Sequence, residues 1–162
     1  MDDGRILVGS HQGAYVIKLT GDVRLSYCTT LDEYVERMFA DKDFVGVLVD
    51  LSEASNVDST TLGQLAKLAI QARDKFDLKP VLLSASPDIT RIVTSMAFDR
   101  IFEIRDECFC DDRPLGSLPA IAGSEADVRA KVMEAHKVLM SLSAHNAASF
   151  RALVNSLEAG DN

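Results

Sequence analysis

Up to about residue 110, short apolar runs alternate with longer segments that have the period of a helix. The apolar runs are bounded by Gly, Pro, Asp or Ser and cover residues 6–8, 15–19, 45–51, 81–83 and 101–104. The first two are separated only by residues 9–13, too few for a parallel crossover, so they predict an antiparallel hairpin. Helical segments between the later runs predict right-handed crossovers and a largely parallel sheet.

Three helices are predicted between these runs. Thr30 and Glu33 have the spacing of a capping box and precede an amphipathic segment, so a helix is expected to begin there. A second helix is expected to start at Asp58 and Ser59, and a third at Ser86. The pattern of the second helix directs one set of side chains inward (Leu62, Leu65, Ala66, Ala69, Ala72, Phe76) and another set outward (Gln64, Lys67, Gln71, Asp74).

The end of the chain has a different organisation. Residues 111–123 contain two prolines and two glycines and are interpreted as a linker between a domain at 1–110 and a helical extension at 124–162. Ser124 is a candidate cap, and two apolar stripes, within 128–142 and 150–157, predict a helical hairpin; a single long helix is the alternative. We expect the extension to pack on the domain or on a partner and tune recognition, or simply to extend the core.

Charge narrows the range of functions. The chain has 162 residues and a formal net charge of −8, from 17 Lys and Arg against 25 Asp and Glu. That sign disfavours direct binding to nucleic acid or to an anionic membrane. The sequence has no apolar run near the roughly 20 residues that cross a bilayer and no signal-peptide pattern at its beginning. We therefore expect a cytoplasmic protein.

Cysteine and histidine spacing does not indicate a metal site. Cys108 and Cys110 supply at most two ligands, half of a site, and are interpreted as ordinary reduced thiols. His11, His136 and His145 lie far apart in the sequence, and each is expected at the surface or in packing. No metal or cofactor is predicted.

Enzyme motifs are also missing from the sequence. It contains no phosphate-binding glycine loop and no G-x-S-x-G turn, so no catalytic residue is predicted. Asp50 ends the central apolar run, where a receiver domain would carry its phosphate-accepting aspartate. The acidic pair and the lysine that such a domain also needs are not at the matching positions. Asp50 is better explained as a carboxylate bonded to nearby backbone.

A cluster of small hydroxyl side chains lies between the central run and the second helix, in residues 55–63. Ser, Thr and Asp are preferred caps, which is a sufficient structural explanation. A phosphate at the same place would gain from the helix dipole and the unpaired N–H groups. Ser59 could therefore carry a charge switch at the surface without disturbing its own domain.

The sequence around this cluster resembles the STAS domains, the family of the bacterial anti-anti-sigma factors. The family motif is roughly Asp-Ser-Ser/Thr-Gly-Leu-Gly after a hydrophobic strand, and five of its six positions match Asp58, Ser59, Thr60, Thr61, Leu62 and Gly63. Thr61 replaces the first glycine. The resemblance extends through the Phe-Asp-Arg-Ile-Phe segment at residues 98–102, and it implies a mixed α/β, mostly parallel sheet with an N-terminal hairpin and packed helices.

The resemblance also implies a function. Ser59 matches the serine phosphorylated by an anti-sigma factor kinase, and a PP2C-type phosphatase would reverse the mark. Unphosphorylated protein would bind the anti-sigma factor and free a sigma factor. Asp58, Thr60, Thr61, Leu62, Gly63 and Asp50 are the accompanying motif or partner-binding candidates, with Thr60 and Thr61 as secondary acceptors or caps.

Two alternatives stay open at this point. A scaffold subunit of a larger STAS assembly, including a homodimer, would use the same fold and self-associate independently of Ser59. A small-ligand-binding regulator would need a pocket at the strand ends near Asp50, Ser84 and Ser86.

Overall fold

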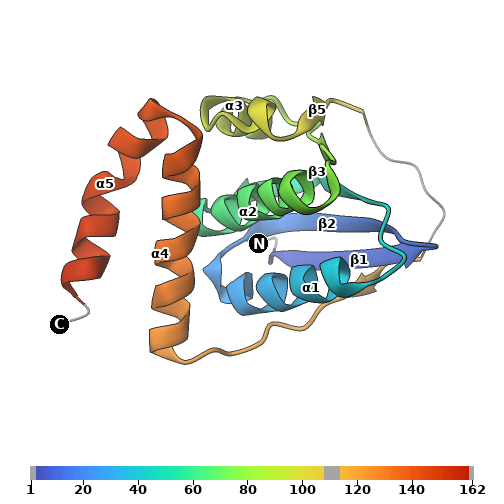
Figure 1. The fold of residues 1–162 in the computed structure, drawn as a ribbon, viewed down its shortest axis with the longest axis horizontal. Helices are drawn as coiled ribbons and strands as arrows, with labels where there is room; N and C mark the ends of the chain where they lie inside the picture. The colour runs from blue at the N-terminus through green and yellow to red at the C-terminus, as the bar shows by residue number, and fades with distance from the viewer. Residues whose placement is uncertain (1–2, 108–113, 161–162) are drawn as a thin grey trace.

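The computed structural model describes residues 3–107 and 114–160 and consists of one sheet, helices against it, and a helical hairpin at the end of the chain (Figure 1). The strands are β1 (Arg5–His11), β2 (Ala14–Val23), β3 (Gly46–Val57), β4 (Val81–Leu83), β5 (Glu103–Arg105) and β6 (Gly116–Ser117). The helices are α1 (Cys28–Ala40), α2 (Ser59–Phe76), α3 (Pro87–Ser95), α4 (Glu125–Leu142) and α5 (Ala144–Ala159), with the 3-10 turns η1 (Leu25–Tyr27) and η2 (Phe98–Arg100).

The strands lie in the order β5-β4-β3-β2-β1-β6. β1 and β2 pair antiparallel, whereas the pairs β2–β3, β3–β4 and β4–β5 are parallel. The predicted N-terminal hairpin and mostly parallel sheet are therefore confirmed. The short edge strand β6, which pairs with Leu7 and Val8 of β1, lies in the segment that the sequence analysis interpreted only as a linker.

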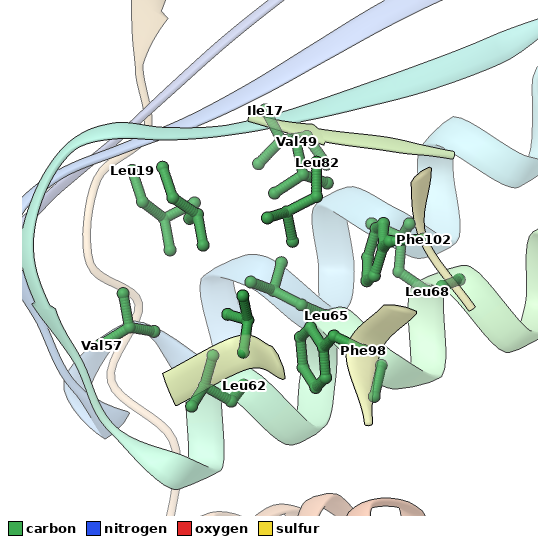
Figure 2. Packing of buried hydrophobic residues seen from close by; sticks show 14 of the residues in the cluster. Ile17, Leu19, Val49, Val57, Leu62, Leu65, Leu68, Leu82, Phe98 and Phe102 are labelled. Atoms are coloured by element: carbon green, nitrogen blue, oxygen red, sulfur yellow. The ribbon is translucent and has the colours of Figure 1, made fainter. Parts of the chain in front are cut away.

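The core lies between the sheet and the helices. Each crossover from β2 to β5 moves the chain in the same direction along the sheet, so right-handed connections place α1, α2 and α3 on one face. Figure 2 shows three leucines of α2, Leu62, Leu65 and Leu68, in the cluster with Val49 of β3 and Ile17 of β2. Each large side chain buried here contributes about 1.5–3 kcal/mol before entropy is subtracted.

The start of the first helix differs from the prediction. α1 begins at Cys28 instead of after Thr30, and its N-cap residue, Tyr27, makes no side-chain cap. The Thr30 hydroxyl instead donates to the carbonyl of Pro119 and accepts from the N–H of Ile121. The capping-box prediction was wrong because Thr30 holds a segment 89 residues further along the chain.

The end of the chain forms the predicted hairpin of two helices. Ser124 caps α4 through the N–H of Asp127, and Ser143 both ends α4 and caps α5 through the N–H of Asn146. Figure 1 shows α4 beside the ends of α1 and α2, with α5 on its outer side. Leu139 and Leu142 of α4 belong to the main core, so the extension packs on the domain.

Candidate functional site: the amino terminus of α2

Ser59 is the first residue of α2 and follows directly from the end of β3. The preceding residue, Asp58, is the N-cap, and its Oδ1 accepts from the N–H of Thr61 at 2.9 Å. Its Oδ2 accepts from the N–H of Leu25 at 2.7 Å, which joins the start of α2 to η1. One carboxylate thus satisfies two backbone donors and fixes the backbone on which Ser59 stands.

The next residues of the motif point inward. Thr60 and Leu62 are buried, and Thr61 is 1% exposed with no hydrogen-bond partner for its Oγ1. Thr60 and Thr61 therefore cannot accept phosphate without a movement of α2, and Leu62 is part of the core. Among the hydroxyl-bearing residues of the motif, Ser59 is the most exposed, and it is half-buried.

At Gly63 the backbone of α4 lies very close to α2. A Cβ atom at this position would lie 2.3 Å from the carbonyl oxygen of Ala135 and 2.7 Å from its Cβ. Real side chains do not tolerate such distances, so the packing of α4 requires glycine here. In this chain Gly63 serves the contact between the domain and its C-terminal helix.

His136 of α4 contacts the candidate phosphate acceptor. Its Nε2 lies 2.7 Å from Ser59 Oγ, and its Nδ1 lies 2.7 Å from the carbonyl oxygen of Val132. Because a carbonyl only accepts, Nδ1 carries a proton, and in this tautomer Nε2 accepts from the Ser59 hydroxyl. The ring is 1% exposed and makes an edge contact with Phe150 of α5.

The contact between Ser59 and His136 spans 77 residues of sequence and was not predicted. His136 was expected only at the surface or in packing. The one available signal was its position next to Ala135 and four residues after Val132, beside the apolar stripe of α4. That position predicts burial, but it does not identify Ser59 as the partner.

A charged cluster borders the same contact. Lys67 of α2 pairs with Asp32 of α1 and with Glu134 of α4, and Lys131 pairs with Asp32 at 3.9 Å. Burial alone would lower the pKa of the Lys67 ammonium, but hydrogen bonds and negative charge from Glu134 and Asp32 outweigh it and the pKa is raised. These pairs join three helices around the face of α2.

The packing of α1 and α4 on α2 explains why part of the predicted pattern of α2 was wrong. Gln64 was expected to point outward, yet it is buried and donates through Nε2 to the carbonyl of Cys28 at 2.6 Å. Lys67 is also only partly exposed. Both sit on the polar side of α2, which the periodicity assigned to solvent and which α1 and α4 in fact cover.

The bend of the hairpin is fastened to the domain separately. Asn146 is 1% exposed, and its Nδ2 donates to the carbonyls of Met96 and Leu139 at 2.8 and 2.9 Å. Arg100 donates to the carbonyl of Leu142 at 2.5 Å. The bend of the hairpin is therefore attached to the domain in addition to the contact at Ser59.

The family model of the STAS domain matches residues 5–108, more than half of the chain. The chain belongs to the STAS domain family. A search of curated proteins gives no match. The matched region includes Ser59 and the whole parallel sheet, whereas α4 and α5 lie outside it.

Membership in the STAS family makes this chain a regulatory domain of the sulfate-transporter and anti-sigma-antagonist type, a class that commonly binds partner proteins. Within the STAS region, Asp50 stands apart from the Ser59 segment. It lies inside β3, not at its end, because the strand continues to Val57. It is 2% exposed, and its Oδ1 accepts from the N–H of Ser52, the structural role expected of it. Its assignment to the partner-binding set stays a prediction.

A small-ligand-binding regulator would need a pocket near the strand ends, and the STAS domain has a hollow there. Its volume is about 660 Å³, and Ser84, Thr90 and Arg91 are among its lining residues, whereas Asp50 and Ser86 are not. The hydroxyls of Ser84 and Thr90 bond to each other at 2.7 Å, and Thr90 also donates to the carbonyl of Ser86. The hydroxyls of Ser84 and Thr90 are therefore engaged within the protein.

The described residues of this STAS chain include no cluster of three or more His, Cys, Asp or Glu side chains suited to a metal ion. Cys108 and Cys110 lie outside the described residues. Within 3–107 and 114–160, none of the helices is both long and apolar enough to cross a membrane.

Proposed function

We propose that this protein is a phosphorylation-controlled anti-anti-sigma factor with Ser59 as the regulated residue. Unphosphorylated protein binds an anti-sigma factor that is also a serine kinase and thereby frees a sigma factor or another regulator. A PP2C-type phosphatase restores the binding form. The observation that carries this proposal is the position of Ser59, first in α2 and held by the Asp58 cap, within a STAS domain.

The chemistry of this position suits a switch. A phosphate adds about −1.5 to −2 charge and three acceptor oxygens, and the amino terminus of α2 tolerates that charge. At a contact surface the same charge opposes docking, the more so on a chain that already carries −8. About 5.5 kcal/mol converts a 99:1 population into 1:99, which steric and charge conflict at an interface can approach.

In this proposal the protein is a substrate and a ligand, and it is not an enzyme. The kinase supplies the nucleotide site and the phosphatase supplies its own metal. The role of this chain is to present Ser59 on a rigid helix start, which the two hydrogen bonds of Asp58 provide.

The proposal is tested by phosphate mapping and partner capture in parallel. The purified protein is incubated with ATP and an extract of the cells that produce it, and phosphopeptides are mapped by tandem mass spectrometry. Ser59→Ala should abolish the label, while Ser10→Ala, an exposed serine of β1, should not. Immobilised wild type should retain a kinase of the anti-sigma class, and Ser59→Asp should not. Phosphate that persists in Ser59→Ala, or oligomers that form regardless of Ser59, would favour the scaffold alternative.

A further inference from the structure

The hydroxyl of Ser59 is occupied within the molecule. It donates to a histidine ring that is almost completely buried, at a distance that leaves no room for another group between them. A kinase must bring a phosphorus atom up to a lone pair of Ser59 Oγ and place its own catalytic base at the position toward which the hydroxyl proton points. In the described conformation His136 fills that position.

The contact is a fitted surface and extends beyond one hydrogen bond. Gly63, one turn along α2 from Ser59, receives the backbone of Ala135 at a distance that no other residue permits. Lys67, a further turn along, pairs with Glu134. Three consecutive residues of α4, Glu134 to His136, thus match one stripe of α2 that begins at the regulated serine.

Phosphorylation and this contact exclude each other. Phosphorylation replaces the hydroxyl proton of Ser59 with a phosphoryl group, so the hydrogen bond that Ser59 Oγ donates to Nε2 of His136 is lost. A phosphoryl group on Ser59 Oγ also needs room beside the ring, which lies 2.7 Å from that oxygen, and because Ala135 already packs closely on Gly63, α4 can make room only by moving away from α2. Asp58, the residue before Ser59, adds a like charge on the same helix start.

From these observations we infer that α4 is an internal ligand for the α2 face that begins at Ser59, and that it competes with the protein partner for this face. This inference rests on the proposed function. Ser59 is phosphorylated only in molecules whose hairpin has moved off α2, and the phosphate then keeps the hairpin off. The partner is a protein that presents its own surface to the stripe of Ser59, Gly63 and Lys67.

Phosphorylation of Ser59 and opening of the hairpin are coupled by thermodynamic reciprocity. If phosphate favours the open hairpin by some factor, then an open hairpin favours phosphate by the same factor. Loss of one hydrogen bond changes such an equilibrium by up to about tenfold. The steric conflict adds to this, so we expect at least a tenfold increase in the opening of α4.

Amide hydrogen exchange tests the coupling without any kinase. Phosphoserine is incorporated at position 59 of the full chain by stop-codon suppression, and exchange is followed by mass spectrometry across α4. The amides of α4 should exchange at least tenfold faster than in the unmodified protein, while those of β2 and β3 keep their protection. Phosphoserine at position 10, on exposed β1, is the matched control and should leave α4 unchanged.

A second variant opens the hairpin without phosphate. Ala135→Leu places bulk against Gly63, whereas Ala130→Leu places the same bulk on an exposed position of the same helix. Ala135→Leu should speed both α4 exchange and Ser59 labelling in cell extract about tenfold, and Ala130→Leu should change neither.

Unchanged α4 exchange with phosphoserine at position 59 overturns the inference, and so does a loss of protection that extends to β2 and β3. Neither result affects the proposed function, which fails separately if the extract does not label Ser59.

Discussion

Replacing Gly63 with alanine isolates the contact between α2 and α4. The new Cβ would lie 2.3 Å from the Ala135 carbonyl oxygen and 2.6 Å from its carbon, and backbone atoms cannot turn aside as a flexible side chain does. Overpacking of this kind costs about 1–3 kcal/mol. If α4 shifts to relieve it, the hydrogen bond between Ser59 and His136 is lost as well, which costs about 0.5–1.5 kcal/mol.

The helix propensity of alanine opposes this loss, so the sign of the Gly63→Ala effect shows whether the contact between α2 and α4 dominates. Alanine in a helix interior is favoured over glycine by about 1 kcal/mol, so α2 taken alone would become more stable. Subtracting this gain leaves a net loss of about 0.5–3.5 kcal/mol in the free energy of unfolding. For a chain of this size each kcal/mol lowers Tm by about 2–4 °C.

The measurement is urea unfolding of Gly63→Ala beside Gly46→Ala. A Cβ at Gly46, the first residue of β3, has no atom within 4 Å, so this control should stay close to wild type. A cycle with His136→Ala completes the test, because a histidine already displaced by Gly63→Ala should cost little to remove. A Gly63→Ala protein as stable as wild type, with additive cycle energies, would refute the close packing of α4 on α2.

Three further outcomes are expected. Asp58→Ala should lower the free energy of unfolding by about 1–2 kcal/mol in urea titrations because both Thr61 and Leu25 lose an acceptor, and Asp58→Asn, which keeps one carbonyl oxygen, should lose less. The hydrogen bond from the Tyr15 hydroxyl to Asp41 raises the pKa of Tyr15 to about 12 and lowers the pKa of Asp41, so its stabilisation holds between the two ordinary pKa values, fades in acid as Asp41 protonates, and fades in base as the pH approaches 12. Tyr15→Phe should return the Asp41 pKa toward its ordinary value in an NMR titration of the carboxyl carbon; an unmoved titration would contradict this. Asn146→Ala should cost about 1–3 kcal/mol, seen by calorimetry, since two buried carbonyls lose their donor, while exposed His145→Ala on the same helix should cost little.

The local elements could be predicted because their signals are short-range. Ser86 and Ser124 act as caps where the sequence indicates, and Asp58 opens α2 at the expected residue. The capping-box prediction at Thr30 failed for the opposite reason. The hydroxyl of Thr30 bonds to the segment between β6 and α4. No local pattern distinguishes a threonine that caps a helix from one that bonds to a segment far away in the sequence.

Only the α2 side of the candidate site could be predicted from the sequence. The motif identified Ser59 and its cap, but the residue opposite Ser59 comes from a helix outside the family match. Gln64 and Lys67 show the same limit. Periodicity divides α2 into an apolar and a polar side, and it does not reveal that α1 and α4 cover the polar side.

The connector between the domain and the hairpin sets how far α4 can travel. Leu118 bonds to Ile6 of β1, Ile121 bonds to Thr30 of α1, and Ser124 already caps α4. Only two residues lie between the last two of these attachments, so their Cα atoms can be at most about 11 Å apart. A hairpin tethered this closely returns to α2 at a high effective concentration, of millimolar order for short linkers. An external partner must bind tightly enough to compete with that effective concentration. The length of the connector therefore sets a minimum affinity, and proteins that bind more weakly leave the face of α2 covered by α4.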